Sequence, residues 1–512
     1  MADAPLLLPD DAANRALLAN VRPADWEPPK PAGRYNLVVL GGGTAGLVTA
    51  AIAAGLGARV ALVEKHLLGG DCLNTGCVPS KAILRAARAW AAVRSAAAFG
   101  VDIPDGVRYD FGAVMARMRR LRAELSGNDS VARFRALGVD VFLGAGRFIA
   151  PDAVLAGDRP LRFVRAAICT GSRPAVPPIP GLAETGYRTS ETVFRLTELP
   201  RRLAVIGGGP IGCEVAQAFA RFGAAVTLLE RSDRLLPRDD PDAGALLVRQ
   251  LCDDGVHVVL QASIAKVRRR DAEKEVLYRS RFGIHQACVD EILVAAGRTA
   301  NVDGLCLGVA GVAFDRAGVR VDDGLRTTNP RVYAAGDVCS EYRFTHVADA
   351  MAQIVIQNAL FPHPFGLGRA RMNRLLIPWC TYTSPEVAHV GLTAEAARAR
   401  GMAIETYTVP LAEVDRAVLD GDTAGFVRVH VRAGTDRLVG ATVVAAHAGE
   451  LVSELTALMN AGKGLSVLSR TIHPYPTQAD ALRRVAIAWR KTQLTGRKKA
   501  VLSRFFRWMR GE

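Results

Sequence analysis

Cys72 and Cys77 are the two residues of this sequence whose type and spacing point most directly to chemistry. Four residues separate them, and the last of these is Gly76, so the chain can bend until the two sulfurs meet. Such a pair could be a redox couple, a structural disulfide or part of a metal site. A zinc site needs two further ligands close by, and none stands at a suitable spacing.

The surrounding sequence favours redox or metal chemistry over a structural disulfide. Pro79 suits the first turn of a helix, which we expect over residues 80–98, and a helix N-terminus stabilises a thiolate. The nine cysteines are odd in number and scattered, unlike the disulfide framework of a secreted protein. Residues 1–29 do not resemble a signal peptide, and no run of about 18 uncharged apolar residues occurs. We therefore expect a cytoplasmic protein.

Two glycine-rich segments share one pattern that predicts dinucleotide binding. In each, a short buried strand leads into Gly-x-Gly-x-x-Gly, a helix follows, and a second strand ends at a glutamate. The first glycine permits a tight turn, the second lets the backbone approach a pyrophosphate, and the third lets helix and strand pack closely. The phosphates would lie at the helix N-terminus, where free N–H groups favour negative charge. The fixed residues are Gly41, Gly43, Gly46 and Glu64 in the first copy and Gly207, Gly209, Gly212 and Glu230 in the second.

The two copies agree in spacing as well as in composition. From first glycine to glutamate the distances are 64 − 41 = 23 and 230 − 207 = 23 residues. We expect strands at 35–40 and 59–63 in the first copy and at 203–206 and 225–229 in the second. One such pattern is a weak signal, but two in register are a strong one. Two bound dinucleotides suggest a flavin that exchanges hydride with a nicotinamide.

Two adjacent residues bear on which nicotinamide is used. Glu230 stands where a carboxylate would accept a hydrogen bond from the free 2′-hydroxyl of NADH and would repel the 2′-phosphate of NADPH. Arg231 follows directly and could accept that phosphate. The pattern favours NADH and leaves NADPH open.

The cysteine segment resembles the redox-active disulfide of the class I pyridine nucleotide-disulfide oxidoreductases, which include dihydrolipoamide dehydrogenase, glutathione reductase and mercuric reductase. The family pattern GG-x-C-x-N-x-G-C-x-P-S-K has every fixed position filled by residues 69–81. The resemblance extends over residues 34–490. It implies an α/β fold with two Rossmann-like domains, for FAD and NAD(P), and a C-terminal α+β dimerisation domain.

The resemblance also assigns roles to individual residues. Cys77 would lie beside the flavin, and Cys72 would attack the substrate. Lys81 would lie near the reactive nitrogen of the flavin and pair with Glu214. Three further segments resemble cofactor-binding motifs of the family. They are CTGSRP with Thr170 and Gly171, AGRTAN with Gly297, and VYAAGDV with Asp337, whose carboxylate would bind the ribityl chain.

The C-terminal part departs from the pattern of dihydrolipoamide dehydrogenase and glutathione reductase. Where those enzymes place the histidine and glutamate of His-Pro-Thr-x-x-Glu, this chain has Tyr475 and Asp480. His473 stands two residues early, a displacement of about 6–7 Å in an extended segment. General acid–base help worth about 10²–10⁴-fold would then be lost. Mercuric reductase has a tyrosine at this position and a second one that Tyr187 matches, so the site resembles that of a metal-ion reductase.

The resemblance to mercuric reductase is incomplete. The last cysteine is Cys380, so this chain lacks the C-terminal cysteine pair of that enzyme, and it lacks the N-terminal Cys-x-x-Cys module as well. Three functions stay open. The first is reduction of a mercuric or other soft metal ion held transiently by Cys72 and Cys77, with no structural metal. The second is a disulfide or dihydrolipoamide enzyme that uses Tyr475 or His473, and the third is flavin electron transfer to a membrane partner such as a quinone.

The expected organisation has five parts. They are a weakly ordered segment at 1–33, an FAD-binding domain at 34–175 and 296–365, an NAD(P)-binding domain at 176–295, a dimerisation domain at 369–490 and a basic tail at 491–512. Family members are homodimers with shared active sites, so Tyr475 would come from the partner subunit.

The net charge of +15 is compatible with anionic cofactors or a membrane surface, and no zinc-finger or RNP pattern supports nucleic-acid binding. In the tail, basic residues alternate with five apolar ones that fall near one helical face. These are Val501, Leu502, Phe505, Trp508 and Met509. Such a helix could lie on the inner face of an anionic membrane, and a solvated or subunit-docked tail is the alternative.

Overall fold

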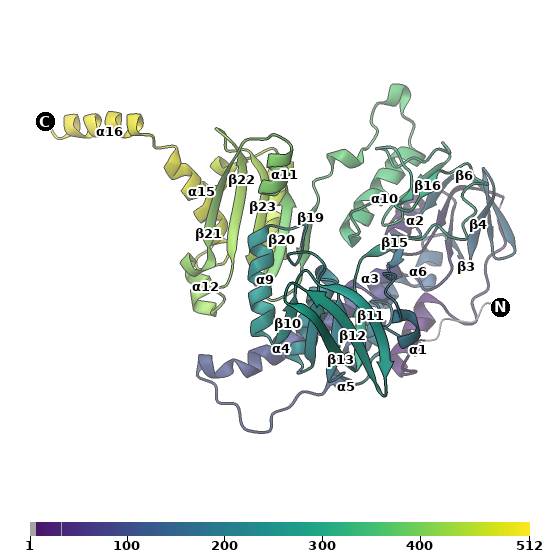
Figure 1. Ribbon diagram of the computed structural model, residues 1–512. Coiled ribbons are helices and arrows are strands. Elements are labelled where there is room, and N and C mark those ends of the chain that lie inside the picture. The colour runs from purple at the N-terminus through teal and green to yellow at the C-terminus, as the bar shows by residue number, and fades with distance from the viewer. Residues whose placement is uncertain (1–6, 32) are drawn as a thin grey trace. The chain divides into compact units, whose positions relative to one another are not determined.

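The computed structural model describes residues 7–31 and 33–512, and the chain divides into two compact units. The first unit takes the residues up to 231 together with 255–375, and the second takes 232–254 and 376–512 (Figure 1). Residues 232–254 were expected to belong to the nicotinamide-binding domain by their place in the sequence. They instead pack within the second unit, where Arg428 bonds Asp240 at 2.9 Å and the indole N–H of Trp379 donates to Asp239 at 2.8 Å.

A seven-stranded sheet forms the centre of the first unit. Its order is β3-β2-β1-β6-β5-β4, and β18 also pairs with β6. The bounds are β1 Arg34–Leu40, β2 Val60–Glu64, β3 Val139–Leu143, β4 Gly146–Ala150, β5 Ala153–Ala156, β6 Arg159–Ile168 and β18 Val332–Ala334. The parallel strands are almost continuously buried, as expected where helices cover a sheet. Helices α2 (Thr44–Gly55) and α10 (Thr345–Leu360) pack against each other beside these strands.

A second parallel sheet carries the second glycine-rich pattern. Its order is β10-β9-β8-β14, and helix α8 (Pro210–Arg221) follows β8. The bounds are β8 Arg202–Ile206, β9 Ala225–Leu229, β10 Val256–Val259 and β14 Glu291–Val294. Both βαβ predictions are thus confirmed, with strand ends within one residue. An antiparallel sheet, β11 (Ser263–Arg270), β12 (Glu273–Ser280) and β13 (Gly283–Val289), lies between β10 and β14 in the chain.

The cysteine segment lies on two consecutive helices. Helix α3 (Gly70–Asn74) holds Cys72, and α4 (Cys77–Arg94) begins at the second cysteine itself. The predicted helix over 80–98 was wrong at both ends. Gly76 caps α4, Pro79 stands at its third position, where its missing N–H leaves no bond unmade, and residues 96–99 form a separate 3₁₀ turn. Helix α4 packs against α5 (Phe111–Leu125) and α8.

The N-terminal segment departs from expectation. Residues 1–33 were predicted to be weakly ordered, yet Ala12–Val21 form helix α1. The side chain of Asp11 caps this helix by accepting a hydrogen bond from the backbone N–H of Asn14 at 2.8 Å, and Leu17 and Val21 are fully buried. Ten residues can stay helical here because their apolar face packs on α5. Residues 1–6 and 32 of the predicted segment lie outside the described residues.

The second unit is built on a five-stranded antiparallel sheet of order β19-β20-β23-β22-β21. The bounds are β19 Pro378–Thr381, β20 Glu386–Gly391, β21 Ile404–Pro410, β22 Phe426–Arg432 and β23 Leu438–Ala445. Valine and alanine side chains of these strands form one buried cluster with α13 (Ala448–Asn460) and α15 (Asp480–Thr492). Helix α9 (Pro241–Asp253) belongs to the same unit.

The chain ends in an isolated helix, α16 (Gly496–Met509), which Figure 1 shows as a separate rod after α15. None of its residues is buried. Among the described residues, no helix combines the length and the apolar character needed to cross a membrane. Shorter elements complete the chain: α6 Val131–Ala136, α7 Leu182–Thr185, α11 Ala394–Ala399, α12 Asp415–Asp420, α14 Leu465–Leu468, β7 Ser172–Pro174, β15 Arg298–Ala300, β16 Phe314–Asp315 and β17 Gly318–Val319.

Candidate active site

The two cysteines face each other across a break between helices. Both are free thiols, and Cys72 is half-buried. Gly76 forms the break, and a side-chain carbon there would stand 2.8 Å from the carbonyl oxygen of Asp71. The close approach of the two helices therefore requires glycine at this position.

The two thiols differ in acidity. A hydrogen bond from Cys72 lowers the pKa of Cys77 to about 6, and Thr345 and Lys81 act in the same direction against burial and Glu214. The same hydrogen bond, with burial, raises the pKa of Cys72 far above its usual range. At neutral pH the reduced pair therefore holds one thiolate, at Cys77, and one thiol, at Cys72.

Thr345 is a site residue that the sequence reasoning missed. Its Oγ1 lies 3.3 Å from Sγ of Cys77, although 268 residues separate the two. Thr345 is the first residue of α10, which begins eight residues after Asp337. No local pattern marks this threonine, so only its place just after a predicted flavin-binding motif could have suggested it.

Lys81 and Glu214 are brought together, as the resemblance implied. Nζ of Lys81 lies 2.8 and 3.1 Å from the two carboxylate oxygens of Glu214. Lys81 is on α4, one turn after Cys77, and Glu214 is buried on α8. The ion pair thus joins the cysteine-bearing helix to the helix of the second dinucleotide pattern. Because the carboxylate of Glu214 is buried, removing the lysine would take away an ion pair that offsets the loss of water around that charge.

A hydrogen-bond network joins the cysteine segment to Asp337. Arg298 bonds the carboxylate of Asp71, one residue before Cys72, and its Nε donates to Oγ of Ser172 at 2.6 Å. Ser172 in turn donates to Asp337 at 2.6 Å. Burial raises the pKa of Asp337, while Ser172 and Arg298 act against that rise. The predicted ribityl-binding carboxylate is therefore held at a fixed place relative to the cysteine helix.

The two glycine-rich turns have the shape that a dinucleotide requires. Gly41 and Gly207 have φ of +106° and +113°, which side-chain-bearing residues rarely adopt. A side-chain carbon at Gly46 or Gly212 would stand 1.8 or 1.9 Å from a carbonyl oxygen of its own turn. These four glycines fit the predicted roles of tight turn and close helix packing.

The middle glycines leave room for phosphate. A side-chain carbon at Gly209 would meet no atom within 4 Å, and one at Gly43 would meet only Gly70, at 3.6 Å. Each lies directly before a helix, α8 and α2 respectively, and the N-terminus of a helix favours an anion. In α8 the first residue is Pro210, which has no N–H, so the backbone donors there begin at Ile211. The residues present thus fit a pyrophosphate at both turns.

The glutamates at the strand ends also stabilise these turns. Glu64 accepts hydrogen bonds from the backbone N–H groups of Gly42 and His66, each at 2.6 Å, and Glu230 accepts from Gly208 at 2.5 Å. Arg231 is exposed beside Glu230. Either carboxylate can accept a further hydrogen bond, because each oxygen has a second lone pair.

The predicted cofactor segments CTGSRP and AGRTAN lie side by side and are joined by hydrogen bonds. Thr170 donates through Oγ1 to the carbonyl of Asn301 at 2.7 Å, and the Asn301 side chain donates back to the carbonyl of Thr170 at 2.9 Å. Gly171 and Gly297 have φ of +67° and +115°, so both allow sharp turns. The strands β7 and β15 pair here.

The two predicted tyrosines have different surroundings. Tyr187 in the first unit is half-buried against the apolar cluster around Ile206 and Val276. Tyr475 in the second unit is 73% exposed, and its hydroxyl donates to Asp415 at 2.9 Å. It lines a pocket of about 380 Å³ together with His473, Asp480 and Arg484. An exposed tyrosine at a pocket is available to a ligand or a partner subunit.

The candidate site residues His473 and Asp480 each bond a different side chain of the second unit. Nε2 of His473 lies 3.1 Å from Glu454 on α13, a partner that sequence reasoning missed because it stands 19 residues away. Asp480 instead accepts a hydrogen bond from Arg484 at 2.6 Å, one helical turn later. His473 thus has a carboxylate partner of its own, and Asp480 serves the first turn of α15.

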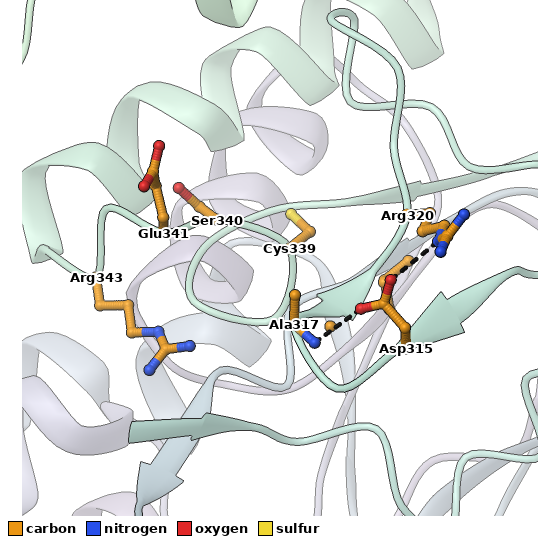
Figure 2. A pocket seen from close by; sticks show the side chains of 9 residues that line it. Asp315, Ala317, Arg320, Cys339, Ser340, Glu341 and Arg343 are labelled. Atoms are coloured by element: carbon orange, nitrogen blue, oxygen red, sulfur yellow. Dashed lines mark hydrogen bonds and ion pairs between the residues drawn. The ribbon is translucent and has the colours of Figure 1, made fainter. Parts of the chain in front are cut away.

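A further pocket, of about 200 Å³, lies beside the predicted flavin motif (Figure 2). Cys339, Ser340 and Glu341 line it, two to four residues after Asp337. On the opposite side Asp315 bonds Arg320 at 3.0 Å, so the charges of that wall are already paired.

Two protein-family models match this chain. "Pyridine nucleotide-disulphide oxidoreductase" matches residues 35–352, and "Pyridine nucleotide-disulphide oxidoreductase, dimerisation domain" matches residues 377–486.

Curated relatives and solved structures agree with this. Mercuric reductase of Staphylococcus aureus is 33% identical over 90% of this chain and 83% of its own length. Dihydrolipoyl dehydrogenase of Bacillus subtilis is 31% identical over 89% of this chain and 98% of its own. A Cu(II) complex of the HOCl-induced flavoprotein disulfide reductase RclA from Escherichia coli superimposes with a TM-score of 0.79 and 30% identity, over 89% of this chain and 100% of that one.

Proposed function

This chain belongs to the pyridine nucleotide-disulphide oxidoreductases, and from that premise we propose that it reduces a soft metal ion through the Cys72–Cys77 pair. It is an enzyme of the FAD- and pyridine-nucleotide-dependent class. The proposal concerns the substrate, a mercuric or cupric ion, and the residues that handle it.

The observation that carries the metal-ion proposal is the surroundings of Tyr475. Where the resemblance places a histidine base, this chain has a phenol that is bonded to Asp415. The hydrogen bond raises the pKa of Tyr475 above its ordinary value, so it remains protonated at neutral pH and is a poor base. Disulfide substrates need a base, whereas thiolates bind a soft cation without one. The similarity to mercuric reductase, and to a flavoprotein disulfide reductase whose structure is a Cu(II) complex, supports the same substrate class.

The cysteines supply what a soft ion requires. Cys77 is already a thiolate near pH 7, because its pKa is about 6. A thiophilic cation would displace the proton of Cys72, so both sulfurs could hold it at once. Bound FAD would supply the transfer of an electron pair from the nicotinamide to the sulfur pair. Two electrons from one NAD(P)H balance the reduction of one Hg²⁺ to Hg⁰ or of two Cu²⁺ to Cu⁺, with release of one proton.

The nicotinamide is proposed to be NADH. The carboxylate of Glu230 lies at the second glycine-rich turn, bonded to the N–H of Gly208 at 2.5 Å. Its negative charge would repel a 2′-phosphate, and Arg231 beside it would moderate this repulsion. We expect a higher kcat/KM for NADH than for NADPH.

The active enzyme is proposed to be a homodimer with shared sites. The second family model is a dimerisation domain, and the matching unit exposes Ile472 at 93% and Tyr475 at 73%. Two large exposed side chains around a pocket are typical of a surface that a second subunit covers. Tyr475 would then act in the site of the partner.

The function is tested by measuring nucleotide oxidation by the purified holoenzyme. The substrates are mercuric ion, cupric ion, lipoamide and a soluble quinone, each with NADH and with NADPH. We expect the metal ions to give the fastest nucleotide oxidation. Cys72→Ser should lower that rate at least 100-fold while the flavin remains bound and reducible. Cys252→Ser, an exposed cysteine outside the pair, is the matched control and should keep the full rate. Full turnover by Cys72→Ser would rule out the thiol route.

The same panel separates the two alternatives. Lipoamide turnover that exceeds metal-ion turnover, and that is lost in His473→Gln, would favour a disulfide reductase using the His473–Glu454 pair. Quinone reduction that is unaffected by Cys72→Ser would favour direct electron transfer from the flavin. Either outcome would replace the metal-ion proposal.

We further propose that α16 contacts an anionic membrane surface from the side of the cytoplasm. Its apolar residues at 501, 502, 505, 508 and 509 follow helical spacing, and Trp508 is 72% exposed. Six basic residues and one acidic residue lie between 496 and 512. A helix with an aromatic face and a cationic face is suited to lie in the plane of such a surface.

Vesicle sedimentation tests this contact. The full-length enzyme should bind vesicles that contain about a third phosphatidylglycerol and should not bind pure phosphatidylcholine vesicles. Trp508→Ser with Phe505→Ser should weaken binding at least tenfold, because roughly 2–3 kcal/mol of apolar burial is lost for each side chain. Phe282→Ser, at an exposed phenylalanine in the turn between β12 and β13, is the matched control. Equal binding by both variants would contradict the contact.

A further inference from the structure

Helix α1 lies outside the family model that begins at residue 35, yet it is built into the first unit. Asn14 is 1% exposed, and Leu17 and Val21 are fully buried. The helix packs against α5 and against the 3₁₀ turn Ser126–Asp129. An extension that buries both an amide and its apolar side chains is part of the folded unit.

One chain of hydrogen bonds runs from α1 to the cysteine segment. Oδ1 of Asn14 accepts from Nη2 of Arg122 at 2.5 Å. Nη1 of the same guanidinium donates to the backbone carbonyl of Asn74 at 2.8 Å. Asn74 lies between the two cysteines, as the last residue of α3. The planar fork of the arginine therefore ties α1 to the loop that separates Cys72 from Cys77.

Arg122 is a buried cation that donates hydrogen bonds to two neutral oxygens. It is 5% exposed, and burial, with the nearby charge of Arg119, lowers its pKa to about 10. It stays charged at neutral pH, so its hydrogen bonds to neutral oxygens must offset the loss of water. Removing Asn14 would leave one arm of the fork without its acceptor in a dry environment.

Other contacts hold the chain that leads into the cysteine loop. The N–H of Leu68 donates to the carbonyl of Val21 at 3.3 Å, and Arg22 donates to the carbonyl of His66 at 2.7 Å. The side chain of Asn74 donates to the carbonyl of Leu68 at 3.0 Å. The lead-in segment and the interior of the loop are thus both attached to the end of α1 or to its partner on α5.

We propose that α1 is a positioning element of the redox loop, and that the Asn14–Arg122–Asn74 chain sets the separation and orientation of Cys72 and Cys77. Disulfide bonds tolerate only a narrow geometry, so a shift of Asn74 changes the balance between the dithiol and the disulfide. Asn14 and Arg122 contact no sulfur, and they act through the backbone of the loop. This inference rests on the proposed function, because it requires that Cys72 and Cys77 alternate between the dithiol and the disulfide.

The test measures the dithiol–disulfide equilibrium of the holoenzyme in buffers of reduced and oxidised dithiothreitol, read out by thiol alkylation and mass spectrometry. Asn14→Ala should change the equilibrium constant at least tenfold, which corresponds to about 30 mV. Asn14→Asp, which keeps an acceptor for Arg122, should restore it to within about threefold. Arg122→Lys, which cannot bond both oxygens in the same way, serves as a second variant if Asn14→Ala does not fold.

The matched control is Asn20→Ala, on the same helix. Nδ2 of Asn20 donates to Oγ of Ser126 at 2.8 Å and has no bond to the cysteine loop. We expect this variant to lower the melting temperature about as much as Asn14→Ala while leaving the equilibrium constant unchanged. Equal constants in all variants, or equal changes in Asn14→Ala and Asn20→Ala, would overturn the inference. A wild-type enzyme whose cysteines never form a disulfide would instead overturn the proposed function.

Discussion

At the scale of residues, the reactivity of the cysteine pair depends on small donors around one sulfur. Cys77 has a pKa of about 6, although burial alone would raise it. The hydroxyl of Thr345, 3.3 Å away, is one of the donors that reverse this effect. Hydrogen bonds to a charged group contribute about 1.5–3 kcal/mol, so one hydroxyl can change which form of the thiol is present at neutral pH.

Thr345→Val should raise the pKa of Cys77 by roughly one pH unit, because valine keeps the shape of the side chain but removes the donor. The measurement is the rate of iodoacetamide alkylation of the reduced enzyme against pH. Thr345→Ser keeps a hydroxyl and should retain the wild-type profile. Identical profiles for the valine and serine variants would show that the hydroxyl does not stabilise the thiolate.

Residues with local signatures were predictable, and residues that act through tertiary contact were not. The cysteines, the six turn glycines and the Lys81–Glu214 pair follow from motifs and their resemblance to a family. Thr345 and Arg122 contact the cysteine segment of the first unit from distant parts of the chain, and Glu454 contacts His473 within the second unit. None of the three has a sequence pattern of its own. Alignment placed Asp480 at the position of the family's glutamate. In the structure its carboxylate bonds Arg484, one helical turn later, at 2.6 Å.

At the scale of elements, each βαβ turn has one glycine that is tightly packed and another, three residues earlier, that has open space around it. Gly212 has no room for a side-chain carbon, since the carbonyl of Gly207 would stand 1.9 Å away. Gly209, three residues earlier, has φ of −77° and open space. Gly212 is therefore expected to matter for stability, and Gly209 for binding of the dinucleotide.

Gly212→Ala should destabilise the enzyme by about 1–3 kcal/mol, because the added methyl forces α8 away from β8. Gly209→Ala should change stability by less than about 0.5 kcal/mol, yet raise the KM for NADH at least tenfold by occupying the place of a phosphate. Thermal unfolding and steady-state kinetics on the two variants check this. The reverse assignment, with binding lost in a stable Gly212→Ala, would contradict it.

Element boundaries show how far local reasoning extends. The strands of both fingerprints were located within one residue because continuous apolar runs bounded by glycine are distinctive. Helix α1 was missed, since ten residues with a low content of charge pairs do not predict a stable helix until α5 covers their apolar face. The cap at Asp11 was a usable signal that the sequence reasoning passed over.

At the scale of the whole molecule, the second unit contains two buried groups with opposite responses to acid. Burial lowers the pKa of His389 to about 4, although its bond to the carbonyl of Gly391 acts in the other direction. Burial raises the pKa of Asp239 to about 6, against the hydrogen bond from Trp379. The indole of Trp379 lies between them, 4.6 Å from the His389 ring. The two effects should nearly cancel.

The signs follow from proton counts. Between pH 6.5 and 4 the unfolded chain binds a proton at His389 that the folded chain does not, so acid lowers stability by about 3 kcal/mol through this group. Between pH 6 and 3.8 the folded chain binds a proton at Asp239 that the unfolded chain does not, so acid raises stability by about 3 kcal/mol.

Single substitutions should therefore reveal opposite slopes. Asp239→Asn should lose stability steeply from pH 7 to pH 4.5, and His389→Gln should lose little or gain over the same range. The measurement is urea unfolding followed by far-UV circular dichroism at several pH values. Parallel pH profiles for the two variants would show that these groups do not control the acid response.

The attachment of α1 has a consequence for biosynthesis. Asn14 and Arg122, which hold the carbonyl of Asn74 through hydrogen bonds, both lie within the first 130 residues, and chains fold from the N-terminus while they leave the ribosome. Thr345, by contrast, is translated more than 200 residues later. The nascent polypeptide therefore contains the residues that position the cysteine loop well before it contains the hydroxyl that helps to lower the pKa of Cys77.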